Sequence, residues 1–325
     1  MAGQLWSVNT LGGYFYSLNL SNELRTAVQP QTRFRQFADA KEAAGKKKGE
    51  TFTWDIVNNI SRGDRALVET NTMGEGSFSI AQGTMTISER GYSVPYSGKL
   101  EDLGKFSVKE TVMKALRNDT AKDLDALCHA QFNSTLLRVV GTSTTAVSLT
   151  TNGTATSTNS VAFNSTHHKA IIDLMKERNI PAFKGDDYMA LAWPSTYRTF
   201  KNNLESLKQY TVEGLTMIMN GEVGRYENCR FVEQTNVPKG GAANSTTFSA
   251  YTNTADAWDN ALSDWIFFFG EDTVTEGIAV PEEVRGKIPA DYGRSKGVAW
   301  YALLGYGLVH TQVAETRVIK WDSAA

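Results

Sequence analysis

The stretch FSVKETVMKALRNDTAKDLDALCHAQFNSTLLRVV, residues 106–140, has the clearest helical periodicity in the chain. Its apolar residues recur at helical spacing, which predicts one amphipathic face. They are Val112, Met113, Leu116, Leu124, Leu127, Cys128 and Phe132, with the small Ala121 on the same stripe. The opposite face is polar and carries Lys109, Lys114, Arg117, Asp119, Lys122 and Asp125.

We therefore predict one long helix over residues 107–138. Ser107 and Glu110 have the spacing of a capping box. Neither Gly nor Pro interrupts residues 106–140, so at about 1.5 Å per residue the rod could reach about 45–50 Å. A long amphipathic helix gains most of its stability from packing. We expect the β-rich remainder of the chain to supply the broad surface on which its apolar stripe packs.

The composition excludes several broad classes of protein. The 325 residues include 33 basic and 35 acidic side chains, so only a local face could bind nucleic acid. No apolar run approaches the roughly 18–20 residues of a membrane span, and the start MAGQLWSVNT lacks the plan of a signal peptide. Cys128 and Cys229 are typical of small buried hydrophobes rather than a disulfide, which indicates folding in a reducing cytosol.

Residues 1–48 are predicted to form an arm that lies on another surface. The arm contains the aromatic residues Trp6, Tyr14 and Phe15, and aromatic side chains are enriched in buried interfaces. They could pack on the chain's own surface, but we favour a second copy. The basic run of Lys46, Lys47 and Lys48 is either solvated or in contact with phosphate groups.

Residues 49–98 predict a two-stranded ribbon. TFTWDIV (51–57) and SFSIAQGTMTIS (77–88) alternate apolar and polar residues, as strands do. A lone two-stranded ribbon is marginally stable in water, so it should lie against a neighbour. Phe52, Trp54 and Phe78 are therefore candidates for contacts between copies.

The remainder predicts a mixed α+β fold. We expect helices over residues 166–179, from Pro194 onward and over residues 212–219. DDYMALAW (186–193), ENCRFVEQTNV (227–237), WIFFFG (265–270) and TRVIKWDS (316–323) are strand-like. Two stretches rich in Thr, Ser, Asn and Gly, residues 141–165 and 238–257, are predicted to be exposed insertions.

No pattern typical of catalysis or of cofactor binding is present. None of the four histidines (His129, His167, His168 and His310) stands in a zinc-binding motif. A nucleophile elbow and the phosphate-binding glycine motifs are absent. Asp186, Asp187 and Glu75 are more typical of turns than of acid–base pairs. We therefore predict a protein that is not an enzyme, with no catalytic residues, cofactor or metal.

The order of the parts resembles that of tailed-phage major capsid proteins with the Hong Kong 97 fold. Within that family it is most similar to the capsid proteins of the N-four-like group. The residues that carry the resemblance are LVETNTMGEGSFSIAQGTMTISERGYSVPYSGKLEDLG (67–104), the helix with its Asp-Leu-Asp (123–125), DDYMALAWPSTYRTFKNN (186–203), GRYENCRFVEQTNV (224–237) and GLVHTQVAETRVIKWDS (307–323).

The resemblance implies a Hong Kong 97-type α+β fold with five parts. These are an N-terminal arm (1–48), an extended β-ribbon loop (49–98), a peripheral domain (99–185 and 298–325) with its spine helix (107–138), and an axial domain (186–297). The last of these would point to the centre of the capsomer.

The resemblance also implies that the chain forms hexamers and pentamers of an icosahedral head that encloses double-stranded DNA. The ribbon would reach over an adjacent subunit and the arm would lie along a neighbour. Lys46, Lys47 and Lys48 could contact the DNA without reading its sequence. The apolar stripe of the long helix would lie on a sheet that includes the last strand, residues 317–321, and its polar face would face the shell interior or a neighbour. A portal protein and a cementing protein are the expected further partners, and assembly would occur in the cytoplasm of a bacterial host.

Two features depart from some relatives. Members that crosslink their subunits need a lysine in the extended loop, and residues 50–98 contain none, so we expect no isopeptide bonds between subunits. Other relatives carry a long N-terminal scaffolding region. Met1 lies only about fifty residues before the ribbon, so we expect a separate scaffolding protein.

Two other readings stay open at this point. The first is the shell protein of an encapsulin-like bacterial compartment, which has a similar fold. The second is a secreted β-rich protein that binds or cleaves carbohydrate, suggested by the Thr/Ser/Asn loops and the tryptophans. The missing signal-peptide pattern weighs against the second reading.

Overall fold

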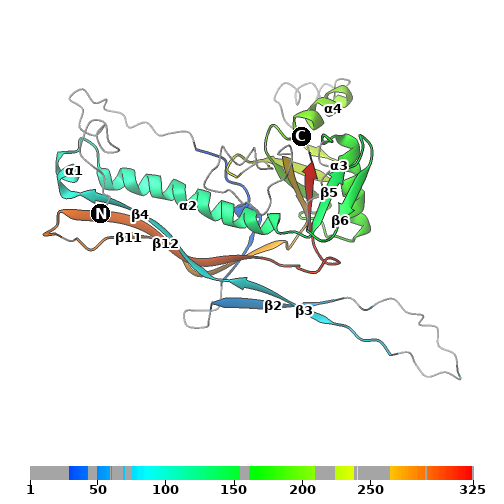
Figure 1. Ribbon diagram of the computed structural model, residues 1–325, viewed down its shortest axis with the longest axis horizontal. Helices are drawn as coiled ribbons and strands as arrows, with labels where there is room; N and C mark the ends of the chain where they lie inside the picture. Colours follow the sequence, from blue (N-terminus) through cyan, green and yellow to red (C-terminus); the bar gives the residue numbers. More distant parts are fainter. Residues whose placement is uncertain are drawn as a thin grey trace.

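A computed structural model of the chain describes residues 29–42, 50–58, 60, 69, 75–153, 161–208, 224–237, 240, 264–289 and 291–323. These residues form a four-stranded sheet under a long helix, a seven-stranded sheet at one end of that helix, and a two-stranded ribbon (Figure 1). The α+β class predicted from the sequence is confirmed. The predicted helix 212–219 and most of residues 238–257 lie outside the described residues.

Helix α2, Val108–Asn133, is the long helix. The hydroxyl of Ser107 accepts the backbone N–H of Glu110 at 3.4 Å, which is one half of the predicted capping box. Its 26 residues span about 39 Å. The predicted extension to residue 138 was wrong, because strand β5 (Leu137–Gly141) follows directly and all five of its residues are buried.

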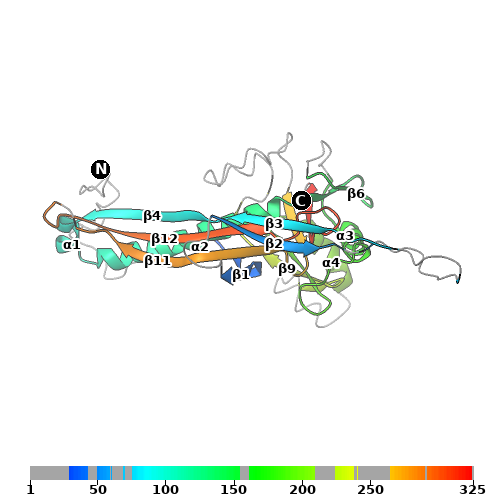
Figure 2. The same cartoon turned by 90° about the horizontal axis from the view of Figure 1, so that it is seen from below.

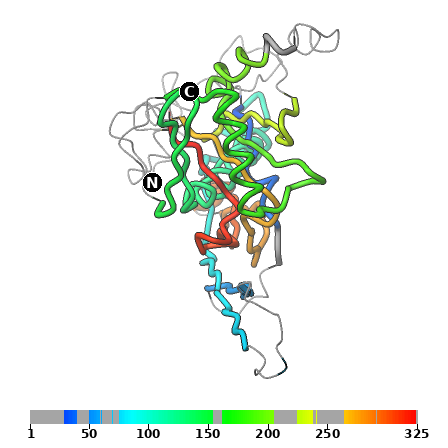
Figure 3. The backbone as a smooth tube through the Cα atoms, turned by 90° about the vertical axis from the view of Figure 1, so that its right-hand side faces the viewer, coloured from blue at the N-terminus to red at the C-terminus, as the bar shows by residue number. Residues whose placement is uncertain are grey.

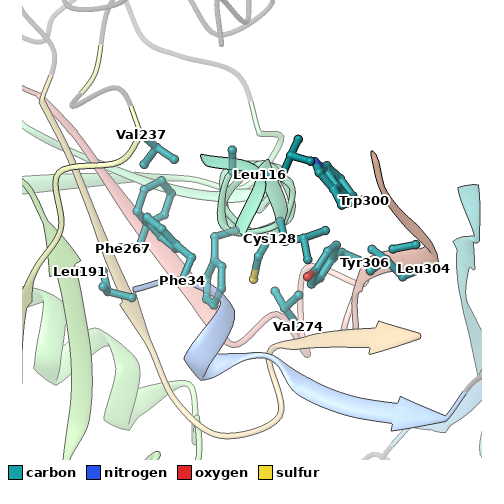
Figure 4. Close-up of a cluster of buried hydrophobic side chains, with 14 of the residues drawn as sticks. Phe34, Leu116, Cys128, Leu191, Val237, Phe267, Val274, Trp300, Leu304 and Tyr306 are labelled. Atoms are coloured by element: carbon teal, nitrogen blue, oxygen red, sulfur yellow. The ribbon is translucent and has the colours of Figure 1, made fainter. Parts of the chain in front are cut away.

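The main length of α2 packs on the four-stranded sheet, whose order is β1-β11-β12-β4. Its strands are β1 (Asp39–Glu42), β4 (Ser88–Ser97), β11 (Val274–Gly286) and β12 (Ser295–Leu308). Leu116 and Cys128 of the predicted stripe share a buried cluster with Trp300 and Tyr306 of β12 (Figure 4). The prediction for Ala121 was wrong, because that residue is exposed.

The last strand of the chain does not belong to the four-stranded sheet. Strand β13 (Val318–Ser323) pairs with β5 and β10 (Asp264–Phe269) in the middle of the seven-stranded sheet. All six residues of β13 are buried, so the strand needs cover on both faces. Only the C-terminal end of α2 reaches this sheet, and the predicted packing of the whole helix on it was therefore wrong.

The seven-stranded sheet has the order β6-β5-β13-β10-β7-β9-β8. Its remaining strands are β6 (Val147–Thr150), β7 (Tyr188–Ala192), β8 (Arg225–Tyr226) and β9 (Cys229–Glu233). Helices α3 (Ser165–Glu177) and α4 (Arg198–Lys208) cover one face, where Ile171 and Phe200 share a buried cluster with Phe268. On the face toward α2, Phe267 joins the cluster of the long helix. The alternation of Phe267 and Phe268 along β10 therefore places one ring in each core.

The predicted helices and cysteines are largely confirmed. Helix α3 matches the helix predicted over residues 166–179. Helix α4 begins at Arg198 rather than at Pro194, because residues 194–197 form a turn first. Cys128 and Cys229 are buried free thiols, as their apolar surroundings predict.

The ribbon consists of strands β2 (Thr51–Val57) and β3 (Ile80–Thr86), paired antiparallel from Thr51–Thr86 to Val57–Ile80. It lies on the side of the four-stranded sheet opposite α2 and extends beyond it (Figures 1 and 3). The predicted ribbon 49–98 is too long, because residues 88–97 are strand β4 and pair with β12 instead.

The two sheets divide the chain differently from the predicted peripheral and axial segments. Strands β5 and β6 and helix α3 belong to the seven-stranded sheet, although residues 137–177 were assigned to the peripheral segment. Strand β11 belongs to the four-stranded sheet, although it was assigned to the axial segment. Backbone pairing of β5 with β13 and of β11 with β12 causes both differences.

Candidate assembly surfaces

The predicted contact residues fall into three groups. Trp6, Tyr14, Phe15, Lys46, Lys47 and Lys48 lie outside the described residues. Phe52 and Trp54 are half-buried on the chain's own surface, and Phe78 is exposed. Of the three predicted contact residues that the structure describes, only Phe78 is therefore largely open to a partner.

The ribbon is seated at its root on the chain's own strand β12 (Figure 2). The indole N–H of Trp54 donates to the carbonyl of Val309 at 3.0 Å, and the rings of Phe52 and Trp54 lie 6.2 Å apart. Both rings line a cleft of about 270 Å³ together with Ile56. The two aromatic residues thus fix where the ribbon leaves the body.

Two glycines of β12 make this close approach possible. A Cβ at Gly305 would lie 2.3 Å from the carbonyl oxygen of Thr86, and one at Gly307 would lie 2.9 Å from the side chains of Met85 and Trp54. A Cβ at Gly286, in contrast, would meet nothing within 4 Å. The ribbon root therefore depends on the absence of side chains at positions 305 and 307.

Gly305→Ala is expected to displace the ribbon root. The methyl group would overlap a backbone oxygen that cannot rotate away, and such overpacking typically costs about 1–3 kcal/mol. Hydrogen exchange should accelerate in β2 and β3, with a smaller change in the seven-stranded sheet. Gly286→Ala is the matched control, and equal exchange in the two variants would contradict this account of the root.

The far end of the ribbon is apolar and exposed. Val57 and Ile80 face each other across the two strands, and Val57, Ile80, Phe78 and Ile60 are 67%, 59%, 58% and 50% exposed. Sequence analysis singled out Phe78 but missed the other three. A sequence signal for this exposed apolar surface was present at Val57, where a second apolar residue follows Ile56 and breaks the alternation.

A second apolar surface lies at the tip of the β11–β12 hairpin. Ile288 and Tyr292 are almost fully exposed, and Leu103 of helix α1 (Gly98–Leu103) is more than half exposed. The backbone N–H of Gly98 donates to the carbonyl of Arg294 at 2.8 Å, which holds α1 next to this tip. Exposed apolar groups at both extremities are typical of a protein that binds partners.

Residues 29–42 of the predicted arm lie on the chain's own surface. Phe34 is fully buried, and its ring centroid lies 4.9 Å from that of His129 and 5.6 Å from those of Phe132 and Phe267. Strand β1 continues this segment and pairs parallel with β11. This part of the arm thus connects the core beneath α2 to the edge of the four-stranded sheet, and for it the prediction of contact with another surface was wrong.

Arg35 and Asp125 anchor this segment. The Arg35 guanidinium lies 2.9 Å from Glu276 and 2.8 Å from Glu282. The carboxylate of Asp125 accepts the backbone N–H of Arg35 at 3.1 Å and the amide of Asn236 at 3.1 Å. Burial raises the pKa of Asp125, although these hydrogen bonds act in the opposite direction.

The assignment of Asp125 to the polar face of the long helix was therefore wrong. It is buried because it caps backbone N–H groups of the arm, a need that the helical period cannot reveal. Lys114, Arg117 and Asp119 on that face are exposed, as predicted.

All four histidines are buried, and burial lowers the pKa of His129, His167 and His168. The pKa of His129 falls to about 3, with a further contribution from the nearby Lys320 ammonium, and that of His168 falls to about 4. Both imidazoles are therefore neutral at pH 7. His129 is stacked on Trp265 with ring centroids 5.9 Å apart.

Acid is expected to destabilise the fold through these histidines. A histidine whose folded pKa is lowered contributes stability that is present above its unfolded pKa of 6.5 and is lost as the pH falls toward the folded value. For His129 the loss is about 3 kcal/mol between pH 6.5 and 4. Asp125 acts in the opposite sense, because its raised pKa favours the protonated folded state.

His129→Phe should flatten the pH dependence of the free energy of unfolding below pH 6.5. Denaturant titrations of the two proteins at a series of pH values would measure this. Parallel curves for the two proteins would show that His129 does not contribute.

No metal centre is evident among the described residues. No group of three or more His, Cys, Asp or Glu side chains among them is placed to hold a metal ion. None of the helices in the described ranges is long and apolar enough to cross a membrane. The described surface instead carries two exposed apolar regions, one at the far end of the ribbon and one at the tip of the β11–β12 hairpin.

Comparison with solved structures reveals the same fold in phage capsids. The capsid structure of the cyanophage P-SCSP1u matches with a TM-score of 0.69 at 14% identity, covering 95% of this chain and 93% of that one. The capsid of cyanophage Pam1 matches with a TM-score of 0.69 at 14% identity, covering 95% and 96%.

The head structure of Helicobacter pylori bacteriophage KHP40 matches with a TM-score of 0.68 at 13% identity, covering 96% of each chain. No protein-family model matches the chain, and no curated protein matches it in sequence. The chain thus has the Hong Kong 97-type α+β fold of tailed-phage capsid proteins.

Proposed function

We propose that this chain is the major capsid protein of a tailed bacteriophage and forms the hexamers and pentamers of an icosahedral head around double-stranded DNA. The observation that carries the proposal is the match of nearly the whole chain, in both directions, to proteins of phage capsids. A match confined to one sheet could reflect a shared module. Here 95–96% of this chain and 93–96% of each matched chain are covered.

The exposed surfaces support the same function. An isolated ribbon is marginal in water, and this one carries exposed Val57, Phe78 and Ile80 at its far end. In the proposed shell this end lies over an adjacent subunit, and residues 1–28 lie along a neighbour. Burying one such side chain contributes about 1.5–3 kcal/mol, which suits an interface that is repeated many times.

The four-stranded sheet with α2 takes the place of the peripheral domain, and the seven-stranded sheet with α3 and α4 that of the axial domain. The N-four-like group is the branch that the sequence pattern favours. Lys46, Lys47 and Lys48 are proposed to contact packaged DNA, and Lys46–48→Gln variants that package DNA normally would remove that role.

Further partners are proposed on the same basis. They are a separate scaffolding protein, a portal protein and a cementing protein, with assembly in the cytoplasm of the host. No enzymatic step is required of the chain. Since the ribbon lacks lysine, subunits are not expected to be joined covalently, and a crosslinked ladder on a denaturing gel of particles would contradict this.

Phe78→Asp tests the role of the ribbon end. The chain should fold normally, because Phe78 is exposed, but the assembly of shells should fail, because a charge would be buried between subunits. Circular dichroism would follow folding, and sedimentation would follow assembly. The control is Asp55→Asn on the same ribbon, which changes a charge on the exposed face nearer the root. Normal assembly of the Phe78→Asp variant would exclude this contact.

A further inference from the structure

A fully buried lysine lies at the junction of α2 with the seven-stranded sheet. The side chains of Lys320 and Asp322, both in β13, have no exposed surface, and Asn133, the last residue of α2, is 2% exposed. The Lys320 ammonium donates a hydrogen bond to the Asn133 side-chain oxygen. Nζ of Lys320 lies 3.5 Å from Oδ2 of Asp322.

The surroundings of these three side chains are aromatic and tightly packed. Nζ of Lys320 lies 3.9 Å from the centroid of the Trp265 ring, and His129 is stacked on Trp265. Arg138 on the neighbouring strand holds Asp322 at 3.0 Å. The Lys320 ammonium is thus hydrogen-bonded to the oxygen of a carboxamide, with a carboxylate beside it, in a site that excludes solvent.

We propose that Lys320 and Asn133 form an isopeptide bond within the chain, with Asp322 as the acid–base group. The proposal is independent of the proposed function. It also differs from crosslinking between subunits, because both partners belong to one chain and no ladder would appear on a gel.

The step balances without an oxidant or a cofactor. Asp322 accepts a proton from Nζ of Lys320, and the free amine attacks Cγ of Asn133. The second Nζ proton passes through the Asp322 carboxylate as the tetrahedral carbon expels Nδ2, which thus receives both protons from Lys320 and leaves as ammonium. One Nζ–Cγ bond forms, one Cγ–Nδ2 bond breaks, and Asp322 returns to its carboxylate. Holding amine, amide and base together replaces the encounter of separate reactants.

The bond would join the two halves of the fold. α2 packs on the four-stranded sheet, whereas β13 lies in the middle of the seven-stranded one. A covalent link between them closes a loop of 187 positions in sequence, which restricts the unfolded chain as a disulfide does. Each subunit would then resist unfolding without any bond to its neighbours.

Mass spectrometry of the purified full-length chain tests the proposal directly. The expected result is an intact mass lower than the sequence mass by one ammonia. A tryptic digest should contain one branched peptide that joins the segments around Asn133 and Lys320, without cleavage after Lys320. An intact mass equal to the sequence mass would overturn the proposal. So would loss of ammonia with separate peptides, because that result indicates a succinimide at an asparagine.

Two variants assign the roles. Asn133→Asp should give the same branched peptide with loss of water, since its carboxyl carbon occupies the same place. Asp322→Asn should retain the native circular dichroism and the full mass, and a linked Asp322→Asn chain would exclude Asp322 as the acid–base group. If either variant fails to fold, the mass of the unaltered chain still decides whether the bond exists.

Discussion

Replacing Leu124 by Asp is expected to prevent the chain from folding. Leu124 is fully buried in the cluster between α2 and the four-stranded sheet, so a carboxylate at this position would lose its hydration. An uncompensated buried charge costs several kcal/mol in addition to the lost packing. Since whole domains are stable by only about 5–15 kcal/mol, the soluble yield should collapse.

Lys114→Glu is the matched control on the same helix. Lys114 is exposed, so the reversal of its charge should change the free energy of unfolding by no more than about 0.5 kcal/mol. Soluble expression and thermal melts would compare the two variants. Equal behaviour in both assays would mean that the faces of α2 are assigned incorrectly. Lys122→Glu should also spare the fold, and any effect of it is expected in assembly.

Phe34→Ala is expected to have the second-largest effect. The ring of Phe34 fills the space between α2 and β10, against His129, Phe132 and Phe267. Truncation of a buried phenylalanine costs about 3–5 kcal/mol. Because Phe34 also anchors residues 29–42, the pairing of β1 with β11 should weaken, and this should appear as faster hydrogen exchange in residues 275–278.

Phe78→Ala removes the same side chain from the exposed end of the ribbon. It should leave the stability of the isolated chain within about 0.5 kcal/mol of the original. Urea titrations of both variants measure the difference. A loss from Phe78→Ala as large as that from Phe34→Ala would contradict the distinction between the internal anchor and the outward contact.

The long helix was predictable because a period of 3.6 residues persists for seven turns and a Ser cap precedes it. Its end was not predictable, because residues 134–138 continue the polar–apolar pattern while the burial of β5 determines their conformation. The strands of the ribbon were predictable from alternation, but their partner was not. Gly305 and Gly307 cannot be distinguished from other glycines in the sequence, because the close contacts that require them form only when the ribbon packs on β12.

Long-range pairing also explains the wrong placement of the final strand. VIKWDS reads as a buried strand in any sheet, and only its ladders with β10 and β5 show which one. The same holds for Asp125 and Lys320, whose polar side chains are buried against residues distant in sequence. Local pattern predicts the elements of this fold, whereas contacts between distant residues decide which of them share a core.

Electron microscopy of the expressed full-length chain, alone and with the proposed scaffolding protein, tests the proposed capsid function most directly. We expect rings of five and six subunits or closed shells tens of nanometres across, with regular shells only when the scaffolding protein is present. Correctly sized shells from the chain alone would remove the separate scaffold but keep the capsid. A monodisperse monomer under every condition would contradict the central claim.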